Sequence, residues 1–186
     1  MKYNVLGGTG LRVSQLCFGV LPMGPNQFGL PPEEGGLLIK EGILRGINFL
    51  DTAQSYRTYP HIRKALDSLK GRRDDIVIAT KSAASSYEDM KAAVEEARQA
   101  LDREVIDIFH LHAARVDAAV FKDRQGALEC LVDSKAKGII RAVGISTHSV
   151  SAVRAAIEVS EIDVIFPIIN IEGLGILHGT KADMEQ

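Results

Sequence analysis

Residues 46 to 56 of the chain read Gly46-Ile47-Asn48-Phe49-Leu50-Asp51-Thr52-Ala53-Gln54-Ser55-Tyr56. The apolar run from Ile47 to Leu50 predicts a buried strand, which ends at Asp51 and is followed after a short loop by Tyr56. In alternating β/α proteins, functional groups gather where a strand ends and a loop begins. The segment is therefore either part of an active site or a polar strand end.

The same pattern of a strand followed by a helix repeats along the chain. Strands are expected at 13–18, 47–50, 75–80, 105–111, 139–145 and 162–169, and helices at 32–45, 61–69, 87–101, 121–137 and 149–159. A further helix is expected to begin at Thr180, and the turn Gly7-Gly8-Thr9-Gly10 predicts a hairpin at the start. Because the strands are mostly continuous β-branched runs, we expect a parallel sheet covered by helices.

Two architectures fit six such strands: an open doubly wound sheet and a (β/α)8 barrel. The first strand–helix turn lacks the GxGxxG dinucleotide motif of the open sheet. Polar side chains also follow successive strands, at Asp51, Lys81, His112, Ser146 and Asn170. In a barrel, every strand end reaches one central mouth, so this succession favours a single barrel domain over residues 1–186.

Four of these polar residues suit one chemistry, although each alone has an ordinary structural explanation. A tyrosine hydroxyl, with a pKa of about 10, is a weak acid, and a nearby lysine ammonium is expected to lower that pKa. Asp51 would keep Lys81 charged, and a neutral His112 would orient the substrate oxygen or help to pass the proton. Together with Tyr56 they predict a proton-donating pocket for a carbonyl, and so hydride transfer. A barrel enzyme that uses His112 and Asp51 on a phosphorylated substrate would leave Tyr56 and Lys81 unexplained.

Five segments of the chain resemble the aldo-keto reductases, in the order in which that family has them. They lie at residues 2–14, 46–56 (GINFLDTAQSY), 79–81 (ATK), 106–112 (IDIFHLH) and 138–146 (GIIRAVGIS). The resemblance implies a TIM barrel preceded by a β-hairpin, and NADPH-dependent reduction of a small-molecule aldehyde or ketone. It places the catalytic tetrad on Asp51, Tyr56, Lys81 and His112, with His110 and Tyr59 as rival residues.

The resemblance also implies a set of cofactor contacts, with departures from the family pattern. These contacts fall on Gly19, Asp51, Ser146, Thr147 and Asn170. Where the family has Ser-Asn to bind the nicotinamide carboxamide, this chain has Ser146-Thr147, followed by His148. Phe166 stands where the family has a glutamine. These departures resemble the bacterial and archaeal branch whose longer members append an iron–sulfur domain.

The resemblance stops after the sixth strand, so the last two strand–helix units of the barrel are expected to be missing. The two end strands would then have open edges, which are expected to aggregate or to pair with another copy of the chain. Two functions remain open. One is an NADP(H)-dependent reductase, and the other is a non-catalytic barrel fragment or interaction subunit with weak or no cofactor binding.

The composition excludes several other classes of protein. With 46% hydrophobic residues and a formal charge of −2, the 186-residue chain is a globular protein with no general attraction to nucleic acid or acidic membranes. Cys17 and Cys130 are expected to be small core residues, and no metal site is expected. Because no signal peptide or membrane-spanning run is evident, a cytoplasmic location is expected.

Overall fold

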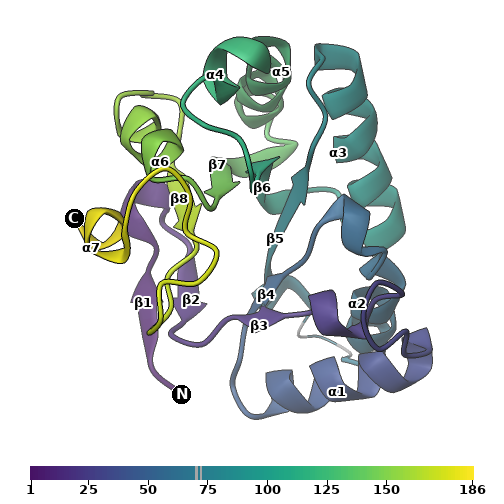
Figure 1. Cartoon of the computed structure of the whole chain (residues 1–186). Helices are drawn as coiled ribbons and strands as arrows, with labels where there is room; N and C mark the ends of the chain where they lie inside the picture. The colour runs from purple at the N-terminus through teal and green to yellow at the C-terminus, as the bar shows by residue number, and fades with distance from the viewer. Residues whose placement is uncertain (70, 72) are drawn as a thin grey trace.

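The computed structural model describes residues 1–69, 71 and 73–186, and its centre is a six-stranded parallel sheet (Figure 1). The strands are β1 Tyr3–Val5, β2 Arg12–Ser14, β3 Phe18–Gly19, β4 Phe49–Asp51, β5 Val77–Ser82, β6 Ile106–Ala113, β7 Ile140–Thr147 and β8 Val164–Pro167. The α-helices are α1 Pro32–Leu44, α2 Tyr59–Asp67, α3 Tyr87–Leu101, α4 Val120–Asp123, α5 Gln125–Ala136, α6 Val150–Ile157 and α7 Lys181–Glu185. Four 3₁₀ turns complete the list: η1 Gly7–Thr9, η2 Leu21–Met23, η3 Gln54–Tyr56 and η4 Arg73–Asp75.

The order of the strands decides between the two architectures. In space the sheet runs β3-β4-β5-β6-β7-β8, the same order as in the sequence, and every neighbouring pair is parallel. A doubly wound sheet would reverse its order at a switch point. The expected barrel is therefore confirmed as a partial barrel of six strands, with β3 and β8 as its two end strands.

Apolar side chains cover both faces of this sheet. On the outer face, Ile39 and Ile43 of α1, Ile62 of α2, Met90 of α3 and Leu131 of α5 join one large buried cluster. On the inner face, Leu11 and Val13 of the predicted hairpin pack against Val77, Ile108 and Ala142 of three strands. In Figure 1 the hairpin β1–β2 lies on the opposite side of the sheet from α1, α2 and α3. The hairpin therefore fills the inner side of the sheet and leaves the carboxyl ends of the strands free.

Two expectations near the start of the sheet were wrong. Residues 13–18 do not form one strand, because β2 ends at Ser14, whose hydroxyl donates to the carbonyl of Leu16 at 2.6 Å. The chain turns there and enters the sheet only at β3. Cys17, in this connection, is exposed rather than in the core, whereas Cys130 is buried as expected.

The helix predictions agree more closely with the structure. Helix α3 spans the predicted residues, and Ser86 caps it by accepting from the amide of Asp89. Thr180 begins α7 with a capping box to Asp183. The helix predicted at 121–137 is divided at Arg124, whose backbone leaves helical geometry. None of the helices in the described part of the chain has the length and apolar character needed to cross a bilayer.

Candidate active site

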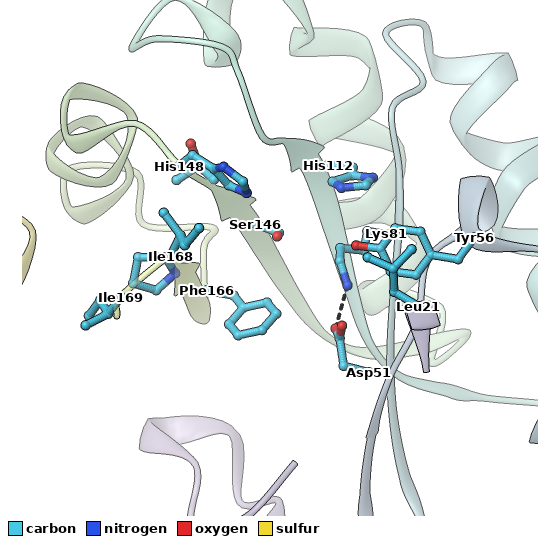
Figure 2. Close-up of a pocket in the computed structure, with 12 residues that line it drawn as sticks. Leu21, Asp51, Tyr56, Lys81, His112, Ser146, His148, Phe166, Ile168 and Ile169 are labelled. Carbon is cyan, nitrogen blue, oxygen red and sulfur yellow. Dashed lines mark hydrogen bonds and ion pairs between the residues drawn. The ribbon is translucent and has the colours of Figure 1, made fainter. Parts of the chain in front are cut away.

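A pocket of about 320 Å³ opens at the carboxyl ends of the central strands (Figure 2). Among the residues that the sequence singled out, Asp51, Tyr56, Lys81, His112 and Ser146 line it. Leu21, Phe166, Pro167, Ile168 and Ile169 supply apolar walls, and Thr147 and His148 complete the lining. Lys81, His112 and Ser146 lie inside their strands rather than just after them, because the strand ladders continue one or two residues further than predicted.

The centre of the pocket is a buried ion pair between β5 and β4. Lys81 Nζ lies 2.5 Å from Asp51 Oδ1 and donates to the carbonyl of Thr52 at 2.7 Å. The side chains of Lys81 and Asp51 are only 2% and 13% exposed. Burial lowers the pKa of Lys81 and raises that of Asp51, while the attraction between the two charges opposes both shifts. The pair therefore holds a positive and a negative charge side by side at the base of the pocket.

Tyr56 stands beside this pair on the turn η3. Lys81 Nζ lies 5.0 Å from the centre of the Tyr56 ring, and the His112 ring meets the Tyr56 ring edge to face at 5.8 Å. The expected lowering of the Tyr56 pKa by Lys81 is not found. Burial, reinforced by the negative charge of Asp51, raises the pKa of Tyr56 to about 12. The ammonium binds Asp51 and Thr52, so Tyr56 keeps its proton at neutral pH.

His112 is a neutral group at neutral pH. Burial lowers its pKa to about 4, and the positive charges of Lys81 and Arg124 add to the effect. The Arg124 guanidinium donates to the backbone carbonyl of His112 at 2.8 Å, which anchors this end of β6. A neutral imidazole beside the Tyr56 ring is able to accept or donate one hydrogen bond.

Of the expected cofactor residues, Asp51, Ser146 and Thr147 line the pocket, whereas Gly19 and Asn170 do not. The Thr147 side chain is fully buried, and its hydroxyl accepts from the amide of Ser149 at 3.0 Å. Asn170 lies outside the lining, and its side-chain amide bonds to the backbone of Leu174 in a local loop. Gly19 pairs with Asp51 in the sheet and also lies outside the lining.

His148 was not singled out as a site residue, but it lines the pocket on the same side as Ser146. Its backbone amide bonds to Ala114, and its carbonyl accepts from Leu177, so its place is fixed on both sides. The signal that would have found it is period 2: side chains two residues apart on a strand face the same way. That rule directs Ser146 and His148 toward the mouth of the pocket and Thr147 away from it.

Comparison with known proteins identifies the family. The model of the aldo/keto reductase family matches residues 15–171. The chain belongs to this family. It is 26% identical to the oxidoreductase YqkF of Bacillus subtilis over 175 residues, or 87% of this chain and 54% of that protein. It is 31% identical to L-galactose dehydrogenase of Arabidopsis thaliana over 122 residues, or 60% of this chain and 38% of that protein.

A solved aldo-keto reductase has the same fold. The holo form of AKR11C1 from Bacillus halodurans superposes with a TM-score of 0.76 at 28% identity, covering 90% of this chain and 57% of that one. This aldo/keto reductase chain therefore spans about half the length of the relatives that it matches. The match therefore shows the family and the fold of this chain.

His110 lies deeper in the barrel of this aldo/keto reductase, two residues before His112. It is 2% exposed, and its Nδ1 has no hydrogen-bond partner in the described part of the chain. The ring packs against Gly144, where an added Cβ would lie 2.1 Å from Nδ1, so the position opposite His110 must remain glycine. Burial lowers the pKa of His110 to about 3. Its place below the mouth leaves His112, rather than His110, as the histidine of β6 that lines the pocket.

These two histidines predict a loss of stability in acid. Because their folded pKa values lie below the ordinary value of about 6.5, the unfolded chain binds protons first as the pH falls. The free energy of unfolding is expected to keep its highest value above about pH 6.5 and to decrease as the pH falls toward 4. At pH 5 the expected loss is about 1–2 kcal/mol per histidine. Urea unfolding at pH 7 and pH 5 measures the difference. His110→Gln should reduce it, and an unchanged difference in that variant would contradict the assignment.

Proposed function

We propose that this chain reduces an aldehyde or ketone to an alcohol with NADPH, using Tyr56 as the proton donor. The observation that carries the proposal is the buried Lys81–Asp51 pair, which lies with Tyr56 and His112 at one pocket. Structural lysines at strand ends are normally solvated, and burying this one requires a compensating partner. A buried ion pair beside a protonated tyrosine supports a catalytic site more strongly than a structural one. The choice of NADPH over NADH rests on the family resemblance alone.

The roles of the four residues follow from their charges. The substrate oxygen would lie between the Tyr56 hydroxyl and the neutral imidazole of His112, and it would take its proton from Tyr56. When bound, a reduced nicotinamide supplies the hydride for the carbonyl carbon. After Tyr56 has given up the proton, the nearby negative charge of Asp51 opposes the phenolate. That effect would be offset by the positive charge of Lys81, which is paired with Asp51. Asp51 keeps that charge in place.

The donor groups of the pocket fit the nicotinamide end of the cofactor. A carboxamide needs one acceptor and one donor, which the Ser146 hydroxyl and the His148 imidazole could provide side by side. Phe166, in register with Ser146, presents an apolar ring at the same wall. The lining offers no cation for phosphates besides Lys81, which is already paired with Asp51. We therefore expect NADPH binding to be weak, with Ser146 and His148 as its contacts and Thr147, Asn170 and Gly19 as less direct ones.

A second candidate is an interaction subunit that assembles through its end strand. Large apolar side chains on and after β8 are exposed: Phe166 by 42%, Ile169 by 52%, Leu174 by 70% and Ile171 by 86%. An apolar end strand of this kind favours pairing with a second copy of the chain. This candidate needs no cofactor and no proton donor.

Titration with NADPH separates the two candidates. We expect the cofactor fluorescence to change on binding, with a dissociation constant that His148→Ala raises by roughly 2–10-fold, the effect of one hydrogen bond. Gln99→Ala, on the exposed surface of α3 and outside the pocket, is the control and should leave the constant unchanged. If NADPH does not bind at concentrations far above cellular levels, the reductase proposal fails and the interaction subunit remains.

A further inference from the structure

The segment that carries Tyr56 is bound to one strand by three consecutive residues. Thr80 Oγ1 lies 2.8 Å from the Tyr59 hydroxyl, and Ser82 Oγ donates to Gln54 Oε1 at 2.7 Å. Lys81, between them, donates to the carbonyl of Thr52. Because side chains alternate along a strand, Thr80 and Ser82 lie on one face of β5 and Lys81 on the other. The segment from Thr52 to Tyr59 is therefore fastened on both faces of the strand end.

Within the turn η3 (Gln54–Tyr56), the side chain of Gln54 makes the fixed contacts. Its carbonyl accepts from Ser82, and its amide nitrogen donates to Glu96 Oε2 of α3 at 2.6 Å. The amide cannot be flipped, because its carbonyl would then face the carboxylate. Ser82 is itself only 1% exposed and also accepts from the amide of Ala84. Gln54 thus bridges the strand that holds Lys81 and the helix beside it.

The side chain of Tyr56 is placed by ring contacts with His112 and Lys81 rather than by hydrogen bonds. No hydrogen bond from its hydroxyl or from the side chain of Ser55 is found in the described part of the chain, which includes the whole turn. The next residue, Arg57, has a φ of +56°, a left-handed conformation that an arginine adopts at a cost. Because this backbone conformation is unfavourable for arginine, contacts elsewhere in the turn must stabilise it.

We infer that Gln54 is a positioning residue, which through Ser82 sets the Tyr56 hydroxyl against Lys81 and His112. The inference rests on the proposed role of Tyr56 as proton donor. A proton donor must lie within hydrogen-bond reach of its acceptor, and a displacement of about 1 Å is enough to lower a rate by roughly 100-fold. Loss of the Gln54 contact is therefore expected to lower kcat by about 10-fold or more, with NADPH affinity unchanged within about twofold.

The position of Tyr56 can be measured without turnover. Its ring meets the His112 ring edge to face, so it shifts the NMR signal of the His112 Cε1–H proton. Tyr56→Leu gives the position of that signal without the aromatic ring. Gln54→Ala and Ser82→Ala are each expected to move the signal toward that value, and together to move it no further, because both remove the same hydrogen bond.

Two residues of α3 provide a control variant for Gln54→Ala and a second substitution that should restore the position of Tyr56. Gln99→Ala removes a glutamine whose side-chain amide donates to Glu95 on the helix surface, and should change neither the signal nor kcat. Gln54→Glu keeps the Ser82 contact but faces Glu96, and Glu96→Gln in the same chain should restore both readings. An unmoved signal in Gln54→Ala overturns the inference, and so does a moved signal with unchanged kcat. If the signal moves but the unmodified chain never turns over, the proposed function fails while the placement of Tyr56 by Gln54 stands.

Discussion

Replacing Tyr56 by phenylalanine is expected to lower carbonyl reduction by about 10²–10⁴-fold, the usual contribution of a positioned general acid. The ring remains, so its contacts with His112 and Lys81 remain too. Only the hydroxyl is lost. A tyrosine hydroxyl with its ordinary pKa of about 10 is already protonated at neutral pH, and burial and Asp51 raise the pKa of Tyr56 further. Steady-state oxidation of NADPH by an aldehyde measures the rate, and fluorescence titration should give an affinity unchanged within about twofold.

Tyr59 provides the matched control for this substitution. Its hydroxyl is buried against Thr80, and it lies three residues further along the same segment. Tyr59→Phe removes one buried hydrogen bond and should cost about 1 kcal/mol of stability while most of the turnover is kept. If Tyr56→Phe turned over as fast as the unmodified chain, Tyr56 would lose its role. A larger loss in Tyr59→Phe than in Tyr56→Phe would transfer that role to Tyr59.

The periodic parts of the fold could be predicted from the sequence, and the ends of its elements less well. Helix α3 begins and ends where the spacing of Met90, Val94 and Leu101 indicates, because one face must be buried over its whole length. Strand ends have no such signal. At Lys81 and His112 a polar residue suggests the end of the strand, but the parallel ladder continues beneath it and the side chain turns into the barrel.

The candidate site was predictable as a set of residues, but its electrostatics were not. Asp51, Lys81 and His112 follow one another on neighbouring strands, so topology alone brings them together. Whether Lys81 lowers the pKa of Tyr56 depends on where the ammonium points and how much water reaches the hydroxyl. The sequence contains neither quantity. His148 was missed because the strand was expected to end at residue 145, so the alternation that directs Ser146 and His148 the same way was not applied beyond it.

Lys81→Met is expected to cost about 3–5 kcal/mol of stability, the range for breaking a buried ion pair. Methionine fills most of the space of the lysine but leaves Asp51 as a nearly buried carboxylate without its cation. The carbonyl of Thr52 loses its donor as well, which loosens the segment that carries Tyr56. Urea unfolding gives the free energy. The same variant should have no measurable reductase activity, because the unpaired negative charge of Asp51 would then oppose the Tyr56 phenolate.

The double variant Lys81→Met/Asp51→Leu separates stability from catalysis. Replacing both members of a buried pair by apolar residues is often neutral or stabilising, so most of the lost free energy should return. Activity should stay low, because the carbonyl of Thr52 in the segment that carries Tyr56 still has no donor. An exposed pair sets the scale: Arg45 and Glu41 have side chains 77% and 57% exposed, and Arg45→Met should cost less than about 1 kcal/mol. If Lys81→Met lowered the free energy of unfolding as little as Arg45→Met does, water would have to reach the Lys81–Asp51 pair. In that case Tyr56 would also be more solvated, and its pKa would be nearer to the ordinary value of about 10. The Tyr56→Phe rate alone would then test whether Tyr56 is the acid.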